Sequence, residues 1–105
     1  MTSINTREIT EINPTKTALE TVVYKLKISN SFNEWANHID NSERDARSSE
    51  GVQVLYRGLE AGSLDRVIII LQAKKGVIDD YVLAQADTFT SNGSRMETIV
   101  SQAYF

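Results

Sequence analysis

The sequence predicts an α+β fold in which four strands form one antiparallel sheet and two helices cover one of its faces. Two observations support this prediction. Apolar residues recur with strand or helix periodicity in the order strand, helix, strand, strand, helix, strand. The length of 105 residues fits one domain with a single hydrophobic core. This order of elements is that of the ferredoxin-like, or split β-α-β, arrangement.

The first strand is predicted over residues 21–28, where apolar and polar side chains alternate. An amphipathic helix is predicted over residues 32–40, because four apolar residues share one helical face: Phe32, Trp35, Ala36 and Ile39. Ser31 and Glu34 match a capping box at its start. We expect the helix to continue through residue 47 with two surface ion pairs four positions apart, Asp40–Arg44 and Glu43–Arg47.

The second half of the chain contains the other four elements. Strands are predicted over residues 52–60 and 66–73, and the short turn between them favours a hairpin. The second of these strands is rich in β-branched residues, which favour strands. A second amphipathic helix is predicted over residues 77–90 and a last strand over residues 96–105.

Residues 1–20 stand apart from this pattern. Their apolar residues are isolated among Thr, Asn and Glu and fit neither a helical nor a strand period. We therefore expect a flexible N-terminal arm at residues 1–20, followed by the ferredoxin-like domain at residues 21–105. The arm is either an unstructured lead-in or a segment that docks on a partner subunit.

The composition excludes several classes of function. The chain has no cysteine and one histidine, which argues against disulfides, thiol catalysis and most metal sites, so we expect no metal and no cofactor. A net charge of -3 disfavours nucleic acid as a partner. The longest apolar run, residues 67–71, is far too short to span a membrane, and no secretory signal is visible. We expect a cytoplasmic protein without a membrane partner.

Both faces of the predicted sheet carry apolar side chains, although two helices can cover only one of them. In the third strand Ile69 points to one face, whereas Ile68 and Ile70 point to the other. An apolar sheet face exposed to water is unusual for a monomer. We therefore expect a homodimer that packs sheet against sheet, with Leu55 and Ile68–Ile70 as candidate interface residues. The pattern does not decide which of the two faces of the sheet forms the interface. The alternative is that the arm folds over this face.

Four segments of the chain resemble a family of small proteins from marine cyanobacteria that is described as a domain of unknown function. These segments are SFNEW, ERDAR, GVQVLYRG and VIIILQA-x-x-G. The resemblance covers residues 21–105. It implies a ferredoxin-like fold of the dimeric α+β-barrel kind and no particular activity. Barrels of this kind often hold a small-molecule pocket between sheet and helices, and some are cofactor-independent monooxygenases.

Six side chains are candidates for such a pocket: Tyr24, Trp35, His38, Tyr56, Arg57 and Tyr81. The three tyrosines are expected on inward faces, where they either line a cavity with polar ends or reach the surface with their hydroxyls. Trp35 also fits a purely structural place in the core, and His38 fits the flank of a helix. Arg57 either clamps a carboxylate or phosphate or pairs with a neighbouring acid such as Glu60.

The sequence thus predicts a homodimeric small-molecule-binding or interaction module. The alternative is an enzyme of the cofactor-independent monooxygenase or isomerase kind, with its pocket between sheet and helices. An amino-acid-sensing regulatory domain has the same strand order, but such domains are usually attached to an enzyme, which 105 residues do not accommodate.

Overall fold

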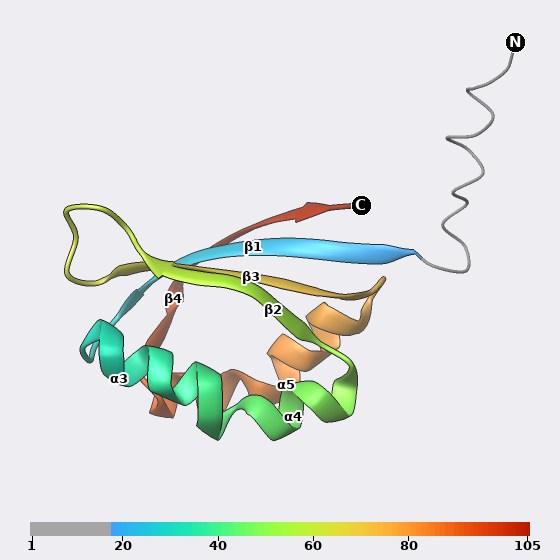
Figure 1. Cartoon of the computed structure of the whole chain (residues 1–105), viewed down its shortest axis with the longest axis horizontal. Helices are drawn as coiled ribbons and strands as arrows, with labels where there is room; N and C mark the ends of the chain where they lie inside the picture. The colour runs from blue at the N-terminus through green and yellow to red at the C-terminus, as the bar shows by residue number, and fades with distance from the viewer. Residues whose placement is uncertain (1–17) are drawn as a thin grey trace, which may run out of the picture.

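The computed structural model describes residues 18–105, in which four strands form one sheet (Figure 1). The strands are β1 (Leu19–Ile28), β2 (Gln53–Leu59), β3 (Arg66–Lys74) and β4 (Ser94–Tyr104). The helices are α3 (Phe32–Asn37), α4 (Arg44–Glu50) and α5 (Val77–Ser91), with a π-helical turn η1 (His38–Ser42) between the first two. Most of the predicted arm lies outside the described residues. The first strand begins at Leu19, two residues before the predicted boundary.

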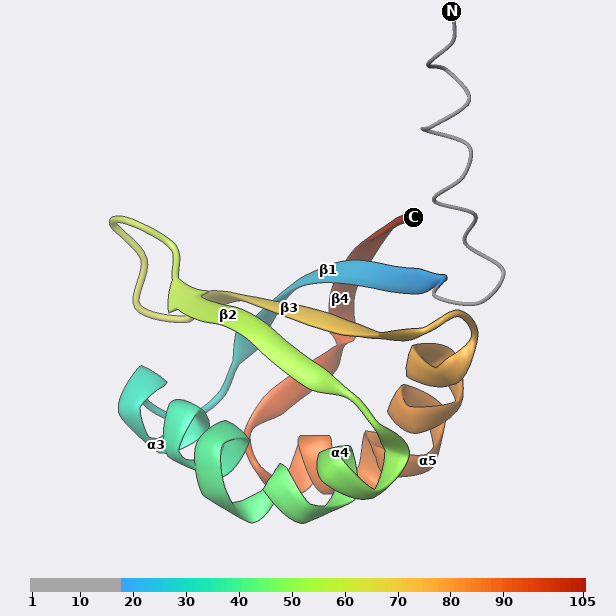
Figure 2. The same ribbon diagram turned by 45° about the vertical axis from the view of Figure 1, so that its right-hand side comes forward.

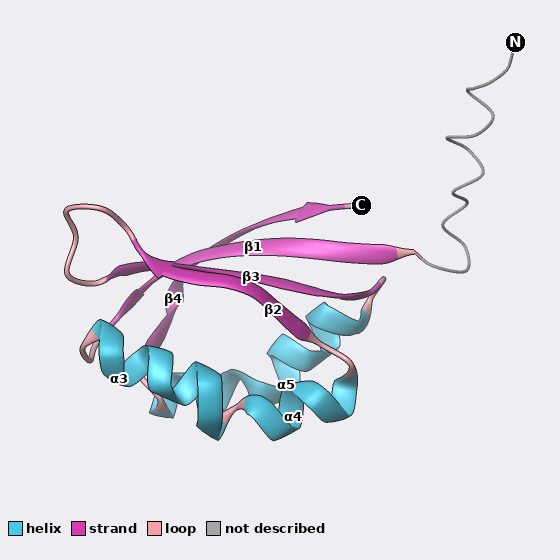
Figure 3. Ribbon diagram, in the orientation of Figure 1, coloured by secondary structure: helices cyan, strands magenta, loops and turns pink. Residues whose placement is uncertain are grey.

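The sheet is antiparallel throughout, with the strand order β2-β3-β1-β4. Within residues 18–105, all helices lie on the same face of it, so no helix of this part of the chain covers the opposite face (Figures 1 and 3). A second view shows α3, η1 and α4 beneath β2 and β3, with α5 beside them (Figure 2). The predicted ferredoxin-like fold class is therefore confirmed.

The predicted capping box begins the first helix. Ser31 Oγ accepts a hydrogen bond from the Glu34 amide at 3.1 Å, and Glu34 Oε1 accepts one from the Ser31 amide at 3.3 Å. The helical path then continues through α3, η1 and α4 and ends at Gly51, whose φ of 74° is a left-handed conformation that glycine adopts without strain. The π-helical turn at residues 38–42 interrupts the regular hydrogen bonding of the predicted helix.

Glu43 and Arg47 are buried, which corrects the predicted surface ion pair. Glu43 is 3% exposed and Arg47 is 9% exposed. Both continue the apolar stripe, because they follow Ile39 by four and eight residues and so return to nearly the same side of the helix. Their charge suggested the surface, but their spacing places them against the sheet.

A β-bulge at Leu55 changes the direction of the side chains that follow in β2. Val54 pairs with Leu71, yet Tyr56 pairs with the next residue of β3, Ile70. The extra residue reverses the alternation, because side chains in a strand point to opposite faces with a period of two. Tyr56 therefore points away from the helices, which corrects its predicted inward direction, and Arg57 points toward them.

The hydrophobic core lies between the helices and the sheet. It is formed by alternate residues of β1 and β3 and by the inner faces of the helices, and Trp35 and Ile78 are its most deeply buried large side chains, at 1% and 0% exposure. Aromatic contacts extend the core, since the rings of Tyr81 and Phe89 meet edge to face at 5.6 Å. No helix within residues 18–105 has both the length and the hydrophobicity to cross a membrane.

The uncovered face of the sheet carries a patch of apolar side chains. Its members come from all four strands: Val23, Tyr56, Ile68, Ile70, Val100 and Tyr104. Tyr56, Val100 and Tyr104 are 57%, 66% and 54% exposed. Cationic residues flank the patch at one end, where Lys25 and Lys27 of β1 lie near Arg66 of β3.

Candidate functional site

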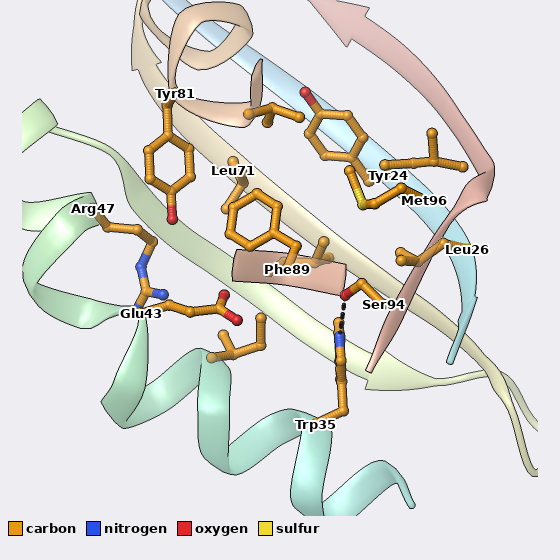
Figure 4. Close-up of a pocket in the computed structure, with 14 residues that line it drawn as sticks. Tyr24, Leu26, Trp35, Glu43, Arg47, Leu71, Tyr81, Phe89, Ser94 and Met96 are labelled. Atoms are coloured by element: carbon orange, nitrogen blue, oxygen red, sulfur yellow. Dashed lines mark hydrogen bonds between the residues drawn. The ribbon is translucent and has the colours of Figure 1, made fainter. Parts of the chain in front are cut away.

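A cavity lies between the helices and the sheet (Figure 4). Its sheet side is formed by Tyr24, Leu26, Ile69 and Leu71 of β1 and β3. Its other walls include Trp35, Glu43 and Arg47 from the first helical segment, Tyr81 and Phe89 from α5, and Met96 from β4. The cavity volume is about 40 Å³, which admits a few water molecules or the head group of a small ligand. A larger ligand requires movement of the half-buried Phe89 and Met96 side chains.

One end of this largely apolar cavity is polar. Glu43 Oε2 accepts a hydrogen bond from Nδ2 of Asn92 at 2.9 Å. Burial raises the pKa of the Glu43 carboxyl, and this bond and the Arg47 charge oppose the rise. Arg47 is 9% exposed, and its Nη1 atom is buried without a hydrogen-bond partner among residues 18–105. This end of the cavity therefore has a carboxyl group with raised proton affinity and an unused guanidinium donor.

Trp35 lines the cavity and also fastens the first helix to the last strand. Its indole Nε1 donates a buried hydrogen bond to Ser94 Oγ at 3.0 Å (Figure 4). Ser94 is the first residue of β4, so the bond joins α3 to the edge of the sheet. The indole nitrogen already has its acceptor and is not free for a ligand.

Two predicted tyrosines contribute to the cavity wall from opposite sides. Tyr24 lies on β1 and Tyr81 on α5, at 7% and 3% exposure. Burial raises the pKa of Tyr24 to about 12, with smaller effects from Asp79 and Glu20. Burial also raises the pKa of Tyr81 to about 12; the Glu43 carboxylate adds to the rise, and the nearby Arg47 guanidinium opposes it. Both phenols therefore remain protonated at neutral pH and can donate hydrogen bonds.

Of the other predicted pocket residues, Arg57 does point toward the helices, but it binds an acid of this chain. Its Nε and Nη2 atoms donate to the two carboxylate oxygens of Asp40 at 2.9 and 2.6 Å. The guanidinium also lies 5.8 Å from the ring centroid of Phe32. The hydrogen bond from Arg57 lowers the pKa of Asp40. Arg57 is thus engaged in a contact between β2 and η1 and does not line the cavity.

The structure also places His38 and Tyr56 away from the cavity. His38 is half-buried in η1, and its Nδ1 lies 3.0 Å from Ser42 Oγ. Tyr56 lies on the uncovered face of the sheet, where its ring approaches Gly58. Of the six predicted pocket residues, Tyr24, Trp35 and Tyr81 line the cavity together.

Sequence reasoning missed the polar end of the cavity. Glu43 and Arg47 looked like a solvated ion pair, although their distance from Ile39 carried the signal that they face inward. Met96 and Phe89 belong to segments predicted correctly as a strand and a helix. Their common place in the cavity wall depends on how α5 and β4 pack, which no local pattern reveals.

The four candidate interface residues separate onto different parts of the sheet. Ile68 and Ile70 lie on the uncovered face, and Leu55 occupies the bulge of the edge strand β2 at 49% exposure. Ile69 belongs to the core beneath the helices and is therefore not on the uncovered face. Within residues 18–105, no group of three or more His, Cys, Asp or Glu side chains is arranged to hold a metal ion.

Comparisons with known proteins give a family and a fold. The family described as Domain of unknown function (DUF3764) matches residues 19–105. No curated protein matches the chain. Among solved structures, a mutant of SnoaB, a cofactor-independent oxygenase from Streptomyces nogalater, is similar with a TM-score of 0.60 and 11% identity, over 83% of this chain and 91% of that one.

Two further structures have the same arrangement. A structural-genomics protein, YJCS, is similar with a TM-score of 0.54 and 13% identity, over 81% of this chain and 97% of that one. The designed protein Foldit4 is similar with a TM-score of 0.52 and 14% identity, over 82% of this chain and 97% of that one. At these identities the likeness establishes the fold alone.

Proposed function

Since this chain belongs to the family described as Domain of unknown function (DUF3764), we propose its function from its own site: it is a homodimeric domain that binds a small molecule between sheet and helices. The observation that carries the proposal is the cavity beside Trp35, Tyr24 and Tyr81. Small-molecule sites are concave and mostly apolar, with a few polar groups that orient the ligand. This cavity has such walls, and Glu43 and Arg47 supply the polar groups.

The dimer is proposed from the uncovered face of the sheet. Ile68 and Ile70 are central to a patch that also includes the exposed side chains of Tyr56 and Val100. A second copy of the same face is a matching cover, because a two-fold axis brings identical apolar surfaces together. The resulting molecule is a dimeric α+β barrel with one cavity in each protomer.

Native mass spectrometry of the protein as purified from cells tests both parts. We expect a two-chain mass that carries a small-molecule adduct, and the mass of the adduct begins its identification. A two-chain mass without adduct is followed by titration with single-ring probes such as acetophenone. Failure of every probe to bind contradicts the binding function, and a one-chain mass at micromolar concentration contradicts the dimer.

The second candidate is an enzyme of the cofactor-independent monooxygenase or isomerase kind, and the burial of Glu43 favours it. A carboxylate whose pKa is raised by burial is a stronger base than an exposed one. Glu43 lines the cavity, so its carboxylate can approach a proton of a ligand bound there. The role proposed for Glu43 is removal of a proton from carbon next to a carbonyl group.

Deuterium exchange separates the enzyme from the binding module. Acetophenone in D₂O exchanges its methyl protons when a base removes them, and NMR follows the loss of the methyl signal. If the enzyme assignment is right, the wild-type protein accelerates this exchange and the Glu43→Gln variant does not. Glu34→Gln, on the exposed surface of α3, is the matched control. Binding of the ketone without exchange leaves the binding module as the function.

A further inference from the structure

The guanidinium of Arg47 has a buried donor that no residue of the described part of the chain, residues 18–105, satisfies. Its Nη1 atom is shielded from solvent and has no hydrogen-bond partner, in a residue that is 9% exposed. Buried donors are nearly always paired in folded proteins, because an unpaired one loses its bonds to water without replacement. Because Arg47 also lines the cavity, a molecule bound there is a candidate partner for this donor.

Two other polar groups at this end of the cavity already have partners, the Trp35 indole nitrogen and one oxygen of the Glu43 carboxylate. Trp35 Nε1 donates to Ser94 Oγ, and Glu43 Oε2 accepts from Asn92. The remaining neighbours of the Arg47 side chain in the cavity wall include Tyr81 and Phe89 (Figure 4). A ligand group that meets Arg47 therefore has to supply an acceptor oxygen, and the rest of the ligand has to be apolar.

The charge balance at this end favours an uncharged acceptor. Glu43 lies one helical turn before Arg47, and its negative charge offsets the positive charge of the guanidinium. A carboxylate in the cavity would add a second negative charge to surroundings that are buried and largely apolar, which is unfavourable. A carbonyl oxygen satisfies the donor without adding a charge.

We propose that Arg47 binds the carbonyl oxygen of an uncharged, otherwise apolar ligand such as a small ketone or ester, through its Nη1 hydrogens. This inference rests on the proposed binding function and names the ligand class of the same site. The cavity volume of about 40 Å³ suits the carbonyl head of such a ligand. Its apolar body then lies toward Phe89 and Met96, whose half-buried side chains move to admit it.

Three single-ring probes test the ligand class: acetophenone, ethylbenzene and benzoate. They share a ring but differ in having a carbonyl, no oxygen, or a carboxylate. We expect NMR titration of the wild-type protein to give about tenfold tighter binding of acetophenone than of ethylbenzene, the ratio expected for one hydrogen bond to a charged group. Benzoate is expected to bind more weakly than acetophenone.

Two variants connect this preference to Arg47. Arg47→Met keeps an unbranched, flexible side chain and removes the donor, so the preference for acetophenone over ethylbenzene should disappear. Arg44→Met removes the same charge from an exposed position of α4 and should keep the preference. If Arg47→Met fails to fold because Glu43 is left as a lone buried charge, the double variant Glu43→Gln/Arg47→Met restores charge balance and serves the same comparison.

The outcomes distinguish the role of Arg47 and its ligand class from the binding function on which they rest. Equal binding of acetophenone and ethylbenzene to the wild-type protein overturns the role of Arg47 and leaves the binding function intact, with water as the partner of Nη1. Tighter binding of benzoate than of acetophenone overturns the uncharged class. Absence of binding by all three probes contradicts the binding function itself.

Discussion

Arg57 of β2 holds the carboxylate of Asp40 in η1 by two hydrogen bonds, Nε to Oδ1 at 2.9 Å and Nη2 to Oδ2 at 2.6 Å. The two side chains are 31% and 45% exposed, so solvent screens the pair. The contact joins the π-helical turn to the edge of the sheet. It fixes the first helical segment above the cavity without being part of it.

Replacement of Asp40 with Asn should destabilise the protein slightly at neutral pH. The pKa of Asp40 is lowered in the folded state, mainly by the hydrogen bond from Arg57, so its stabilising effect is present above the usual carboxyl pKa and is lost as the pH falls through the lowered value. We expect Asp40→Asn to lower the free energy of unfolding by at most about 1 kcal/mol at pH 7. Urea unfolding measures this difference, which should shrink in strong acid. A constant difference at both pH values would contradict the role of the ionised pair.

Replacement of Ser94 with Ala should destabilise the protein more than the loss of an exposed serine. The change leaves the buried indole Nε1 of Trp35 without its acceptor, which costs about 1–3 kcal/mol. Ser101→Ala, at an exposed position of the same strand, is the control and should change little. Urea unfolding compares the two variants, and equal stability would mean that the indole finds another acceptor.

Glu43 should make the stability of the protein depend on pH in the direction opposite to Asp40. Burial raises its pKa in the folded state above 4.5, the ordinary value, so the charged form opposes folding at neutral pH. As the pH falls from neutral toward about 4.5, Glu43 takes up a proton in the folded protein and this cost disappears. The wild-type protein should therefore gain stability relative to Glu43→Gln over that interval. Unfolding at the two pH values measures the change, and a parallel response of both proteins would contradict it.

Two neighbouring isoleucines of β3 should respond differently to a charge. Ile70→Asp places a carboxylate on the uncovered face, so we expect a folded protein that no longer dimerises. Ile69→Asp buries a carboxylate in the core, which should cost several kcal/mol and prevent folding. Circular dichroism reports folding and native mass spectrometry reports the number of chains. An Ile70→Asp protein that remains a dimer would rule out this face as the interface.

The strands and helices could be predicted because their patterns are local. Alternation along β1 identifies its buried side, and Ser31 with Glu34 identifies the start of α3. The direction of Tyr56 could not be predicted in this way, since the bulge at Leu55 depends on how β2 pairs with β3. The largely apolar run VQVLY is compatible with pairing with or without the bulge, so it does not show which face Tyr56 joins.

The candidate site was only partly predictable. Tyr24, Trp35 and Tyr81 were found because aromatic residues on inward faces approach the core. Glu43 and Arg47 were assigned to the surface because charged residues are rarely buried. Their burial follows from the packing of the helix against the sheet, and Asn92, far along the chain, offsets part of its cost by a hydrogen bond to Glu43.

Local sequence patterns are enough to predict the order of the elements, the apolar side of each regular element and the capped start of the first helix. These features follow from backbone geometry and from interactions between residues a few positions apart. Three features come from contacts between distant segments: Arg57 meets Asp40, Tyr56 faces outward, and the cavity has a polar end beside Arg47. Such contacts depend on strand register and on the packing of distant segments, whose energies no local pattern contains.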